Sequence, residues 1–311
     1  MVTAETKTKT NISFKNILLA TDFSQASDNA LAYAAAIARL HHGKLFLAHA
    51  IPPEVPTSVP LDPLPWSLDR DLQEAEINMR RFARKKFLEH IAYEGVIERG
   101  PTSEVILDLI ARNRVDLLVL GTHGRGGLKK LLLGSVAEEL FRLAACPVLT
   151  VGPGAFVPAT AEPVIRRVLF VTDFSPASLN ALPYAISIAR ESNAQIFLLH
   201  ILSVVPLAEE ASFWPVSSSV IDWVEQSRLS TLEQLRKLIP AEENLPRNPD
   251  SLVTLGFVPE EIVKTAGQIN ADLIVMGVNE SSAARAAAHL YWSTAHYVVC
   301  EATCPVLTIK G

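Results

Sequence analysis

The sequence predicts an α/β protein made of two tandem doubly wound parallel sheets, each with five strands. Three observations predict this class. Strand-like apolar runs alternate with amphipathic helical segments along the 311 residues, the whole pattern occurs twice, and hydrophobic residues make up 49% of the chain. A chain of this length and composition can bury a sizeable core in each half.

The repeat has a period of about 150 residues, which is the length of a domain and far longer than a solenoid repeat. Three motifs carry it most clearly: Thr21-Asp-Phe-Ser24 returns as Thr172-Asp-Phe-Ser175, Phe46-Leu-Ala-His49 as Phe197-Leu-Leu-His200, and Cys146-Pro-Val-Leu-Thr150 as Cys304-Pro-Val-Leu-Thr308. We therefore expect a disordered polar tail at 1–14, a first domain at 15–152, a Gly/Pro-rich linker at 153–164 and a second domain at 165–311.

Each half is expected to alternate strands and helices. The strands of the first half, rich in Val, Ile and Leu, are predicted at 16–21, 44–50, 95–99, 116–120 and 147–151. The amphipathic helices between them are predicted at 26–41, 68–93, 103–113 and 135–144. Strands of the second half are predicted at 167–171, 195–201, 251–255, 272–276 and 305–310. The proline-rich segment 52–66 is predicted to run extended over the surface, as a plain connector or as a lid.

This alternation predicts parallel sheets covered by helices on both faces, with ligands bound beyond the carboxyl ends of the strands. Asp22 directly follows the first strand, and Gly121 directly follows the fourth. If these two strands are neighbours, the aspartate and the segment after Gly121 line one crevice.

Residues 121–135, Gly-Thr-His-Gly-Arg-Gly-Gly-Leu-Lys-Lys-Leu-Leu-Leu-Gly-Ser, form a candidate phosphate-binding loop. Glycines let backbone N–H groups approach an anion closely, and Ser135 falls where the next helix should begin. The spacing fits neither a P-loop nor a dinucleotide fingerprint. Other interpretations stay open: Ser135 is a plain helix cap, Asp22 caps the helix near Ser24, and the loop's basic residues Arg125, Lys129 and Lys130 are solvated or screen phosphate charge.

The order Gly-x-x-Gly, nine residues, then Gly-Ser, together with Asp22 and the repeat, resembles the universal stress protein family over nearly the whole chain. The resemblance implies an adenine nucleotide alpha hydrolase-like, Rossmann-like three-layer sandwich in each half. It further implies ATP as the ligand, with Mg²⁺ as a candidate companion ion. By position, it assigns Ala20, Asp22 and Ala50 to the adenosine end, Leu120 and Gly121 to the strand edge, and Gly124, Gly134, Ser135 and Val136 to the phosphates.

The second half departs from this motif. It keeps Asp173 and Gly277, but Glu280 stands where the first half has Gly124, and Trp292 and Ser293 stand where it has Gly134 and Ser135. A carboxylate would repel phosphate, and an indole would block close approach to the backbone. We therefore predict that the second half does not bind ATP in the family manner.

Composition and charge exclude several classes of function. The net charge of −5 and the pI near 5.9 disfavour nonspecific nucleic-acid or anionic-membrane binding. The three cysteines form no CxxC pair, no run of eighteen apolar residues occurs, and the first residues do not resemble an export signal. These features favour the cytoplasm. His49 and His200 lack further ligands at metal spacing, so we interpret them as packing residues and expect no metal site.

The resulting hypothesis is a cytoplasmic ATP-binding protein that acts in stress-response regulation. No catalytic set is evident in the sequence, so at most weak ATP hydrolysis is expected. Two alternatives stay open: a slow ATPase or nucleotide transferase that uses Asp22 with Mg²⁺, and a structural interaction module without nucleotide. The resemblance also implies that the final strands at 147–151 and 305–309 lie at the sheet edge and pair between the domains, which gives an internal pseudo-dimer. A further homodimer and a regulatory protein partner are open.

Overall fold

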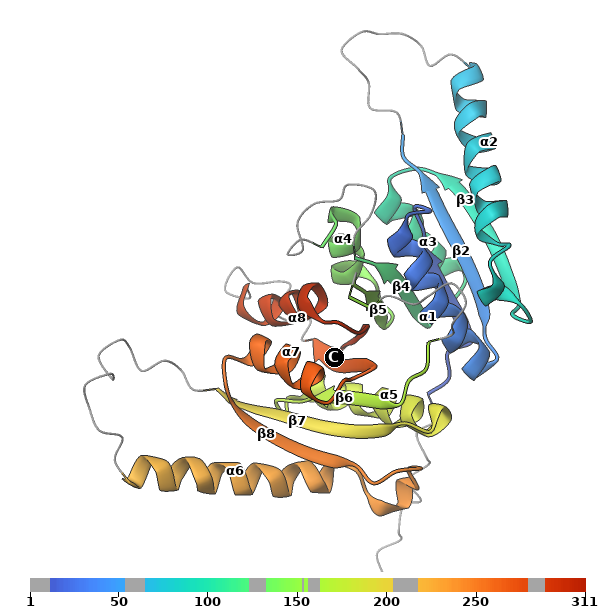
Figure 1. The fold of residues 1–311 in the computed structure, drawn as a ribbon. Coiled ribbons are helices and arrows are strands. Elements are labelled where there is room, and N and C mark those ends of the chain that lie inside the picture. The colour runs from blue at the N-terminus through green and yellow to red at the C-terminus, as the bar shows by residue number, and fades with distance from the viewer. Residues whose placement is uncertain are drawn as a thin grey trace, which may run out of the picture.

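The fold is built around one ten-stranded sheet, in the order β3-β2-β1-β4-β5-β10-β9-β6-β7-β8 (Figure 1). The computed structural model describes residues 12–53, 65–122, 133–152, 154–155, 163–203, 218–278 and 289–311. The strands are β1 Asn16–Ala20, β2 Lys44–Ile51, β3 Tyr93–Arg99, β4 Leu117–Gly121, β5 Val148–Val151, β6 Arg167–Val171, β7 Gln195–Ser203, β8 Asp250–Gly256, β9 Leu273–Val278 and β10 Val306–Lys310. Each half contributes five parallel strands, which confirms the predicted fold class, and the two sets are continuous.

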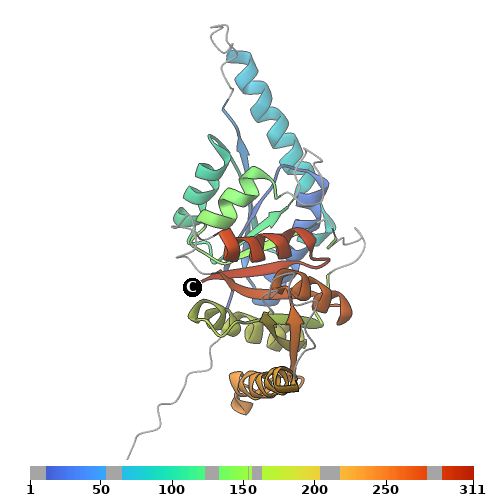
Figure 2. The ribbon, with the colours of Figure 1, turned by 90° about the vertical axis from the view of Figure 1, so that its left-hand side faces the viewer.

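Helices cover both faces of this sheet, as Figures 1 and 2 show. They are α1 Gln25–His41, α2 Pro65–Phe82, α3 Thr102–Arg112, α4 Ser135–Leu143, α5 Pro176–Ser192, α6 Ser218–Leu238, α7 Val258–Gln268 and α8 His289–Glu301. One buried cluster joins α1, α2, α5 and α6 to the sheet, and a second joins α3, α4, α7 and α8 to its other face. Residues of β1 alternate between the clusters, Leu18 in one and Ile17 and Leu19 in the other, which explains the continuously apolar strands.

The two halves meet along β5 and β10, which pair antiparallel with Leu149 opposite Leu307. The hydroxyl of Thr150 donates to the Val306 carbonyl at 3.1 Å, and the hydroxyl of Thr308 donates to the Val148 carbonyl at 3.2 Å. Buried hydroxyls need partners, and here each half of the repeat supplies the partner of the other. The predicted pairing of the two final strands is confirmed.

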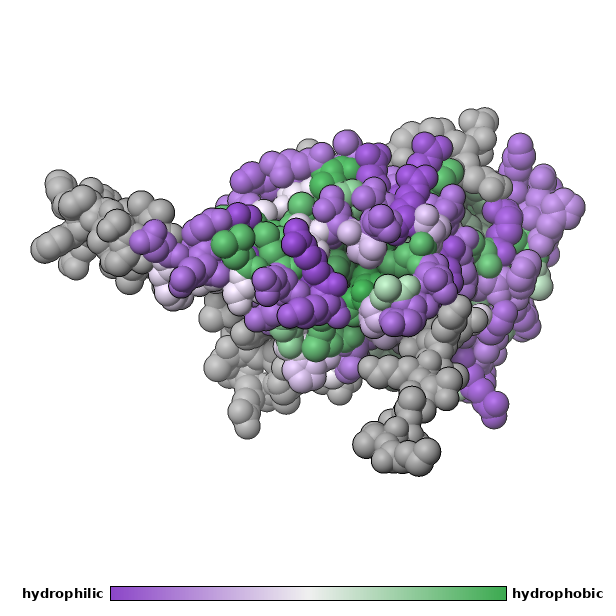
Figure 3. Space-filling model, turned by 90° about the horizontal axis from the view of Figure 1, so that it is seen from below, coloured by the Kyte–Doolittle hydropathy of each residue, from purple (hydrophilic) through white to green (hydrophobic). Residues whose placement is uncertain are grey.

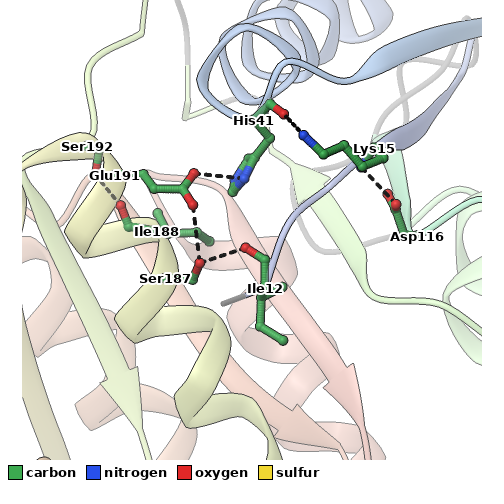
Figure 4. A network of polar contacts seen from close by, with 8 residues as sticks. All are labelled: Ile12, Lys15, His41, Asp116, Ser187, Ile188, Glu191 and Ser192. Atoms are coloured by element: carbon green, nitrogen blue, oxygen red, sulfur yellow. Dashed lines mark hydrogen bonds and ion pairs between the residues drawn. The ribbon is translucent and has the colours of Figure 1, made fainter. Parts of the chain in front are cut away.

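A second seam joins the ends of α1 and α5 (Figure 4). His41 Nδ1 lies 2.8 Å from a carboxylate oxygen of Glu191. Lys15 donates to the His41 carbonyl at 2.6 Å, and Ser187 donates to the Ile12 carbonyl at 2.7 Å. No motif in the sequence indicated this contact between the halves.

The helix predicted at 68–93 is wrong at both ends. Helix α2 ends at Phe82, and a short 3-10 helix at Lys86–Leu88 precedes β3. There Phe87 and Leu88 are buried beside α1, and Arg39 donates to the Phe87 carbonyl at 3.1 Å. Tertiary burial thus ends a pattern that is helical by sequence.

Helix α2 begins at Pro65, so the end of the segment predicted to be extended is already helical. Proline suits the first helical turn, where its missing N–H costs nothing. Residues 54–64 lie outside the described part of the chain. Within the described ranges, no helix is both long enough and apolar enough to cross a membrane.

Candidate functional site

A cavity of about 740 Å³ opens at the carboxyl ends of β1, β2 and β4. Strand β1 lies between β2 and β4, so this is the point where the strand order reverses and where open α/β sheets bind ligands. Eight of the nine residues assigned from the sequence line it: Ala20, Asp22, Ala50, Leu120, Gly121, Gly134, Ser135 and Val136. The ninth, Gly124, lies outside the described residues, as do Arg125, Lys129 and Lys130.

The turn between β1 and α1 fixes the Asp22 carboxylate at the edge of this cavity. Phe23 has φ of 62°, and its N–H donates to the Thr21 hydroxyl at 3.0 Å. The Asp22 carboxylate accepts from the Ser24 N–H at 3.0 Å and from the Ser27 hydroxyl at 2.7 Å. Ser24 is the N-cap of α1, so the alternative in which Asp22 itself caps the helix is wrong. Asp22 instead braces the turn that precedes the cap.

The two strand histidines support these turns. His49 Nδ1 lies 2.8 Å from the Thr21 carbonyl, and His200 Nδ1 lies 2.9 Å from the Thr172 carbonyl. Each imidazole also packs against the phenylalanine of the turn, with 4.4 Å between ring centroids for Phe23 and 4.9 Å for Phe174. The interpretation of both as structural residues is confirmed, although His49 also lines the cavity.

Gly121 and Gly134 serve different purposes. A Cβ atom at Gly121 would lie 2.8 Å from the carbonyl carbon of Ala26, so close packing of α1 on β4 requires glycine there. At Gly134 the nearest atom among the described residues would be the Thr122 oxygen at 3.7 Å, and φ is −58°. Among the described residues, neither packing nor backbone conformation requires glycine at 134.

Helix α4 presents its first turn to the cavity. Gly134 is its N-cap, held by an N–H donation to the Thr122 carbonyl at 3.1 Å. The first N–H groups of a helix have no acceptor within it and carry a partial positive charge, which attracts anions. Ser135 and Val136 are both exposed on this turn. The arrangement suits a phosphate or carboxylate group.

The sequence analysis did not assign several residues that line the cavity. Thr102 and Ile106 of α3, Thr122 after β4 and Glu138 in the first turn of α4 also line the cavity. The α3 residues carry no local signal, because only the crossover connection brings that helix over β2. Glu138 could have been noticed as an acid four residues after the last loop glycine.

The wall therefore combines small apolar residues over β1 and β2, such as Ala20, Ala48 and Ala50, with the glycines and the helix N-terminus beside β4. This suits a small molecule with a flat, weakly polar part and an anionic part. Among the described residues, no group of three or more His, Cys, Asp or Glu side chains is placed to hold a metal ion.

The universal stress protein family profile matches the chain twice, at residues 13–152 and 165–310. The chain belongs to the universal stress protein family. A universal stress protein of Mycobacterium tuberculosis, Rv2623, is 30% identical over 228 residues, which cover 69% of this chain and 73% of that protein. One from Thermus aquaticus is 35% identical over 144 residues, 44% of this chain and 98% of its own length.

The solved structures agree on the fold. The crystal structure of a universal stress protein from Archaeoglobus fulgidus superposes with a TM-score of 0.70, covering 95% of this chain and 98% of that chain at 21% identity. At this identity the likeness concerns the fold alone. It extends over both halves and therefore over the ten-stranded arrangement of this universal stress protein.

The second universal stress repeat has the same turn between its first strand and first helix, but that helix lies closer to the glycine that follows the fourth strand. Ser175 is the N-cap of α5, and its N–H donates to Asp173 at 2.9 Å. Burial raises the pKa of Asp173, but hydrogen bonds from Ser175 and Ser178 outweigh it and leave the pKa below its ordinary value. A Cβ atom at Gly277 would lie only 2.1 Å from the Ala177 carbonyl oxygen, against 2.8 Å for the nearest atom at Gly121.

Helix α5 thus sits closer to its strand than α1 does. The predicted loss of ATP binding in the second repeat depends on Glu280, Trp292 and Ser293. Glu280 lies outside the described residues. Trp292 and Ser293 belong to helix α8, but their side chains are not among those described.

Proposed function

We propose that the first repeat binds ATP, with Mg²⁺ on its phosphates, and that the bound nucleotide regulates the protein's interactions in a stress response. One observation carries the proposal. Four separate segments bring the family's nucleotide-binding positions around one cavity at the switch point of the sheet. The volume of about 740 Å³ is within the range of small-molecule sites.

The residues fit the parts of the nucleotide. Small side chains at Ala20 and Ala50 leave room for a planar base, and the first turn of α4 offers N–H groups to phosphate oxygens. Among the described residues, only the Thr122 oxygen lies within 4 Å of a Cβ atom placed at Gly134, which leaves room beside them for a phosphate group. In the second repeat, the closer approach of α5 at Gly277 supports the prediction that ATP does not bind there in the same manner.

Calorimetric titration of the full chain with ATP and Mg²⁺ tests the proposal, with Gly134→Asp as the variant and Gly134→Asn as its matched control. Both side chains are favoured N-caps of nearly equal size, so α4 should fold in each. Only Asp adds a charge that repels phosphate, so it should weaken ATP binding at least about tenfold more than Asn does.

The number of sites decides between the alternatives. One site in the wild type, with affinity at least about tenfold lower in Gly134→Asp than in Gly134→Asn, supports the proposal. No binding in the wild type would favour the structural module, and two sites would contradict the prediction for the second repeat.

We also propose that the protein works in the reducing cytoplasm. Cys146, Cys300 and Cys304 are all free and buried. Burial raises the pKa of Cys146 to about 11 and that of Cys304 to about 12, so these thiols stay protonated and unreactive. Fewer than three free thiols in denatured protein taken directly from its cells would contradict this location.

We propose, finally, that homodimers form on the side of α6 and β8. Strand β8 ends the sheet, so one of its edges has no partner strand among the described residues. Trp223, Leu229 and Phe257 are 67%, 51% and 62% exposed there. Figure 3 shows hydrophobic residues gathered among hydrophilic ones on this side. A monomeric mass by light scattering at high micromolar concentration would exclude such a dimer.

A further inference from the structure

The second repeat caps the helix that carries the proposed phosphate site. Lys310, the last residue of β10, donates from Nζ to the Arg142 carbonyl at 2.6 Å and to the Ala144 carbonyl at 2.7 Å. These carbonyls belong to the C-terminal end of α4. A cation at this end satisfies acceptors that have no partner within the helix, and it complements the helix dipole.

The same repeat also contacts the chain just before α4. Leu133 and Cys300 of α8 are buried in the same hydrophobic cluster. Leu133 lines the cavity directly before the N-cap, Gly134.

A third contact lies behind the N-cap. A Cβ atom at Gly152 would lie 3.6 Å from the carbonyl oxygens of both Val299 and Ala302 of the second repeat, and 3.9 Å from the Thr122 hydroxyl. The Thr122 carbonyl in turn accepts the N–H of Gly134. The end of α8 therefore lies against Gly152, beside the Thr122 whose carbonyl holds the N-cap of α4.

The contact of Lys310 with the end of α4 has no counterpart in the first repeat. When the repeats are aligned on Cys146-Pro-Val-Leu-Thr150 and Cys304-Pro-Val-Leu-Thr308, Gly152 occupies the position of Lys310. The first repeat therefore offers no lysine at the equivalent position to the end of α8. The asymmetry matches the motif, because the helix held at both ends is the one in the repeat that keeps the family's glycine spacing.

We propose that Lys310 is a positioning residue, through which the second repeat holds α4 where its N-terminus meets the nucleotide phosphates. This inference rests on the proposed ATP site. Affinity for the triphosphate then depends on the contact between the repeats. By reciprocity, bound ATP strengthens that contact by the same free energy.

The test compares Lys310→Met with Lys310→Arg in the full chain, with Lys264→Met as control. Lys264 is an exposed lysine of α7 bonded to Glu261 of its own helix. Calorimetry measures affinity for ATP and for adenosine. Lys310→Met should weaken ATP binding about tenfold and leave adenosine binding within about twofold, because only the phosphates depend on α4. Lys310→Arg should restore most of the loss, and Lys264→Met should show none.

Unchanged ATP affinity in Lys310→Met would overturn the inference, and so would equal losses for ATP and adenosine, which indicate general destabilisation. If the wild type binds no ATP, the proposed function fails. The role of Lys310 in holding α4 is then still tested by hydrogen exchange without nucleotide. The α4 amides must exchange faster in Lys310→Met than in Lys264→Met, and equal exchange rates would reject this role.

Discussion

His41 Nδ1 at the end of α1 lies 2.8 Å from the carboxylate of Glu191 at the end of α5, across the boundary between the two repeats. The His41 side chain is 1% exposed and that of Glu191 24%. Phe14 packs edge-on against the imidazole, with ring centroids 5.0 Å apart, and Lys15 bonds to the backbone of the same residue. A titratable group is thus enclosed at the seam.

Acidification should weaken the protein through His41. Burial, assisted by the nearby Lys15 charge, lowers the pKa of His41 from 6.5 to about 4. Between pH 6.5 and about 4, His41 is protonated in the unfolded chain but not in the folded chain. The free energy of unfolding therefore decreases as the pH falls. Burial raises the pKa of Glu191, which offsets part of this loss at the acid end. Between pH 7 and 5, urea unfolding should show the wild type losing about 1–2 kcal/mol more than His41→Gln.

His41→Gln removes the titration and keeps a hydrogen-bonding side chain. It lowers stability at every pH, so the comparison concerns the slope with pH. Parallel pH profiles for the two proteins would show that His41 does not titrate differently on folding.

The seam also indicates what sequence can and cannot predict. The family resemblance predicted that β5 and β10 pair between the repeats, and the need to cover apolar strand edges supported this. Two other contacts between the repeats each depend on one pair of residues more than 140 positions apart in the sequence. They join His41 to Glu191 and Lys310 to Ala144. No local periodicity records such contacts.

The candidate site shows the same division. Gly121 and Gly134 were assigned from motif spacing, because the chain itself brings them to the end of β4 and the start of α4. Ile106 was missed, because its place in the wall depends on how α3 packs across the sheet. The prediction that the helix reaches residue 93 was wrong, because burial of Phe87 outweighs the helical periodicity of the sequence.

The hydroxyls that cross the β5–β10 seam should each stabilise the protein. Thr150→Val and Thr308→Val keep the side-chain volume nearly unchanged but remove a buried donor to the other repeat. Each should lower the free energy of unfolding by about 1 kcal/mol. Thr150→Ser and Thr308→Ser keep the hydroxyl and serve as matched controls in urea unfolding. Equal losses in the Val and Ser variants would assign the effect to packing.

The two aspartates should differ in nucleotide binding. Asp22 lines the cavity and accepts from Ser27, so Asp22→Asn should weaken ATP binding by about tenfold, whereas Asp173→Asn in the second repeat should leave it unchanged. Calorimetry measures both. Equal effects of the two substitutions would contradict the assignment of ATP to the first repeat.

The same pair tests the enzyme alternative. Steady-state phosphate release that is lost in Asp22→Ala and kept in Asp173→Ala would favour an ATPase. Our expectation is little or no turnover in the wild type, because the Asp22 carboxylate accepts hydrogen bonds from Ser24 and Ser27, which hold it in the turn before α1.

Alanine at the three glycines should rank by the space around each. Gly277→Ala places a methyl group 2.1 Å from a carbonyl oxygen of α5, and Gly121→Ala places one 2.8 Å from the backbone of α1. Relief requires a shift of a whole helix, so we expect losses of about 3 kcal/mol and about 2 kcal/mol in chemical unfolding. Among the described residues, the methyl group of Gly134→Ala meets nothing closer than 3.7 Å, so this variant should lose about 0.5 kcal/mol or less. A large loss at Gly134 would mean that folding, and not a ligand, requires the glycine there, which would remove one support of the proposed phosphate site.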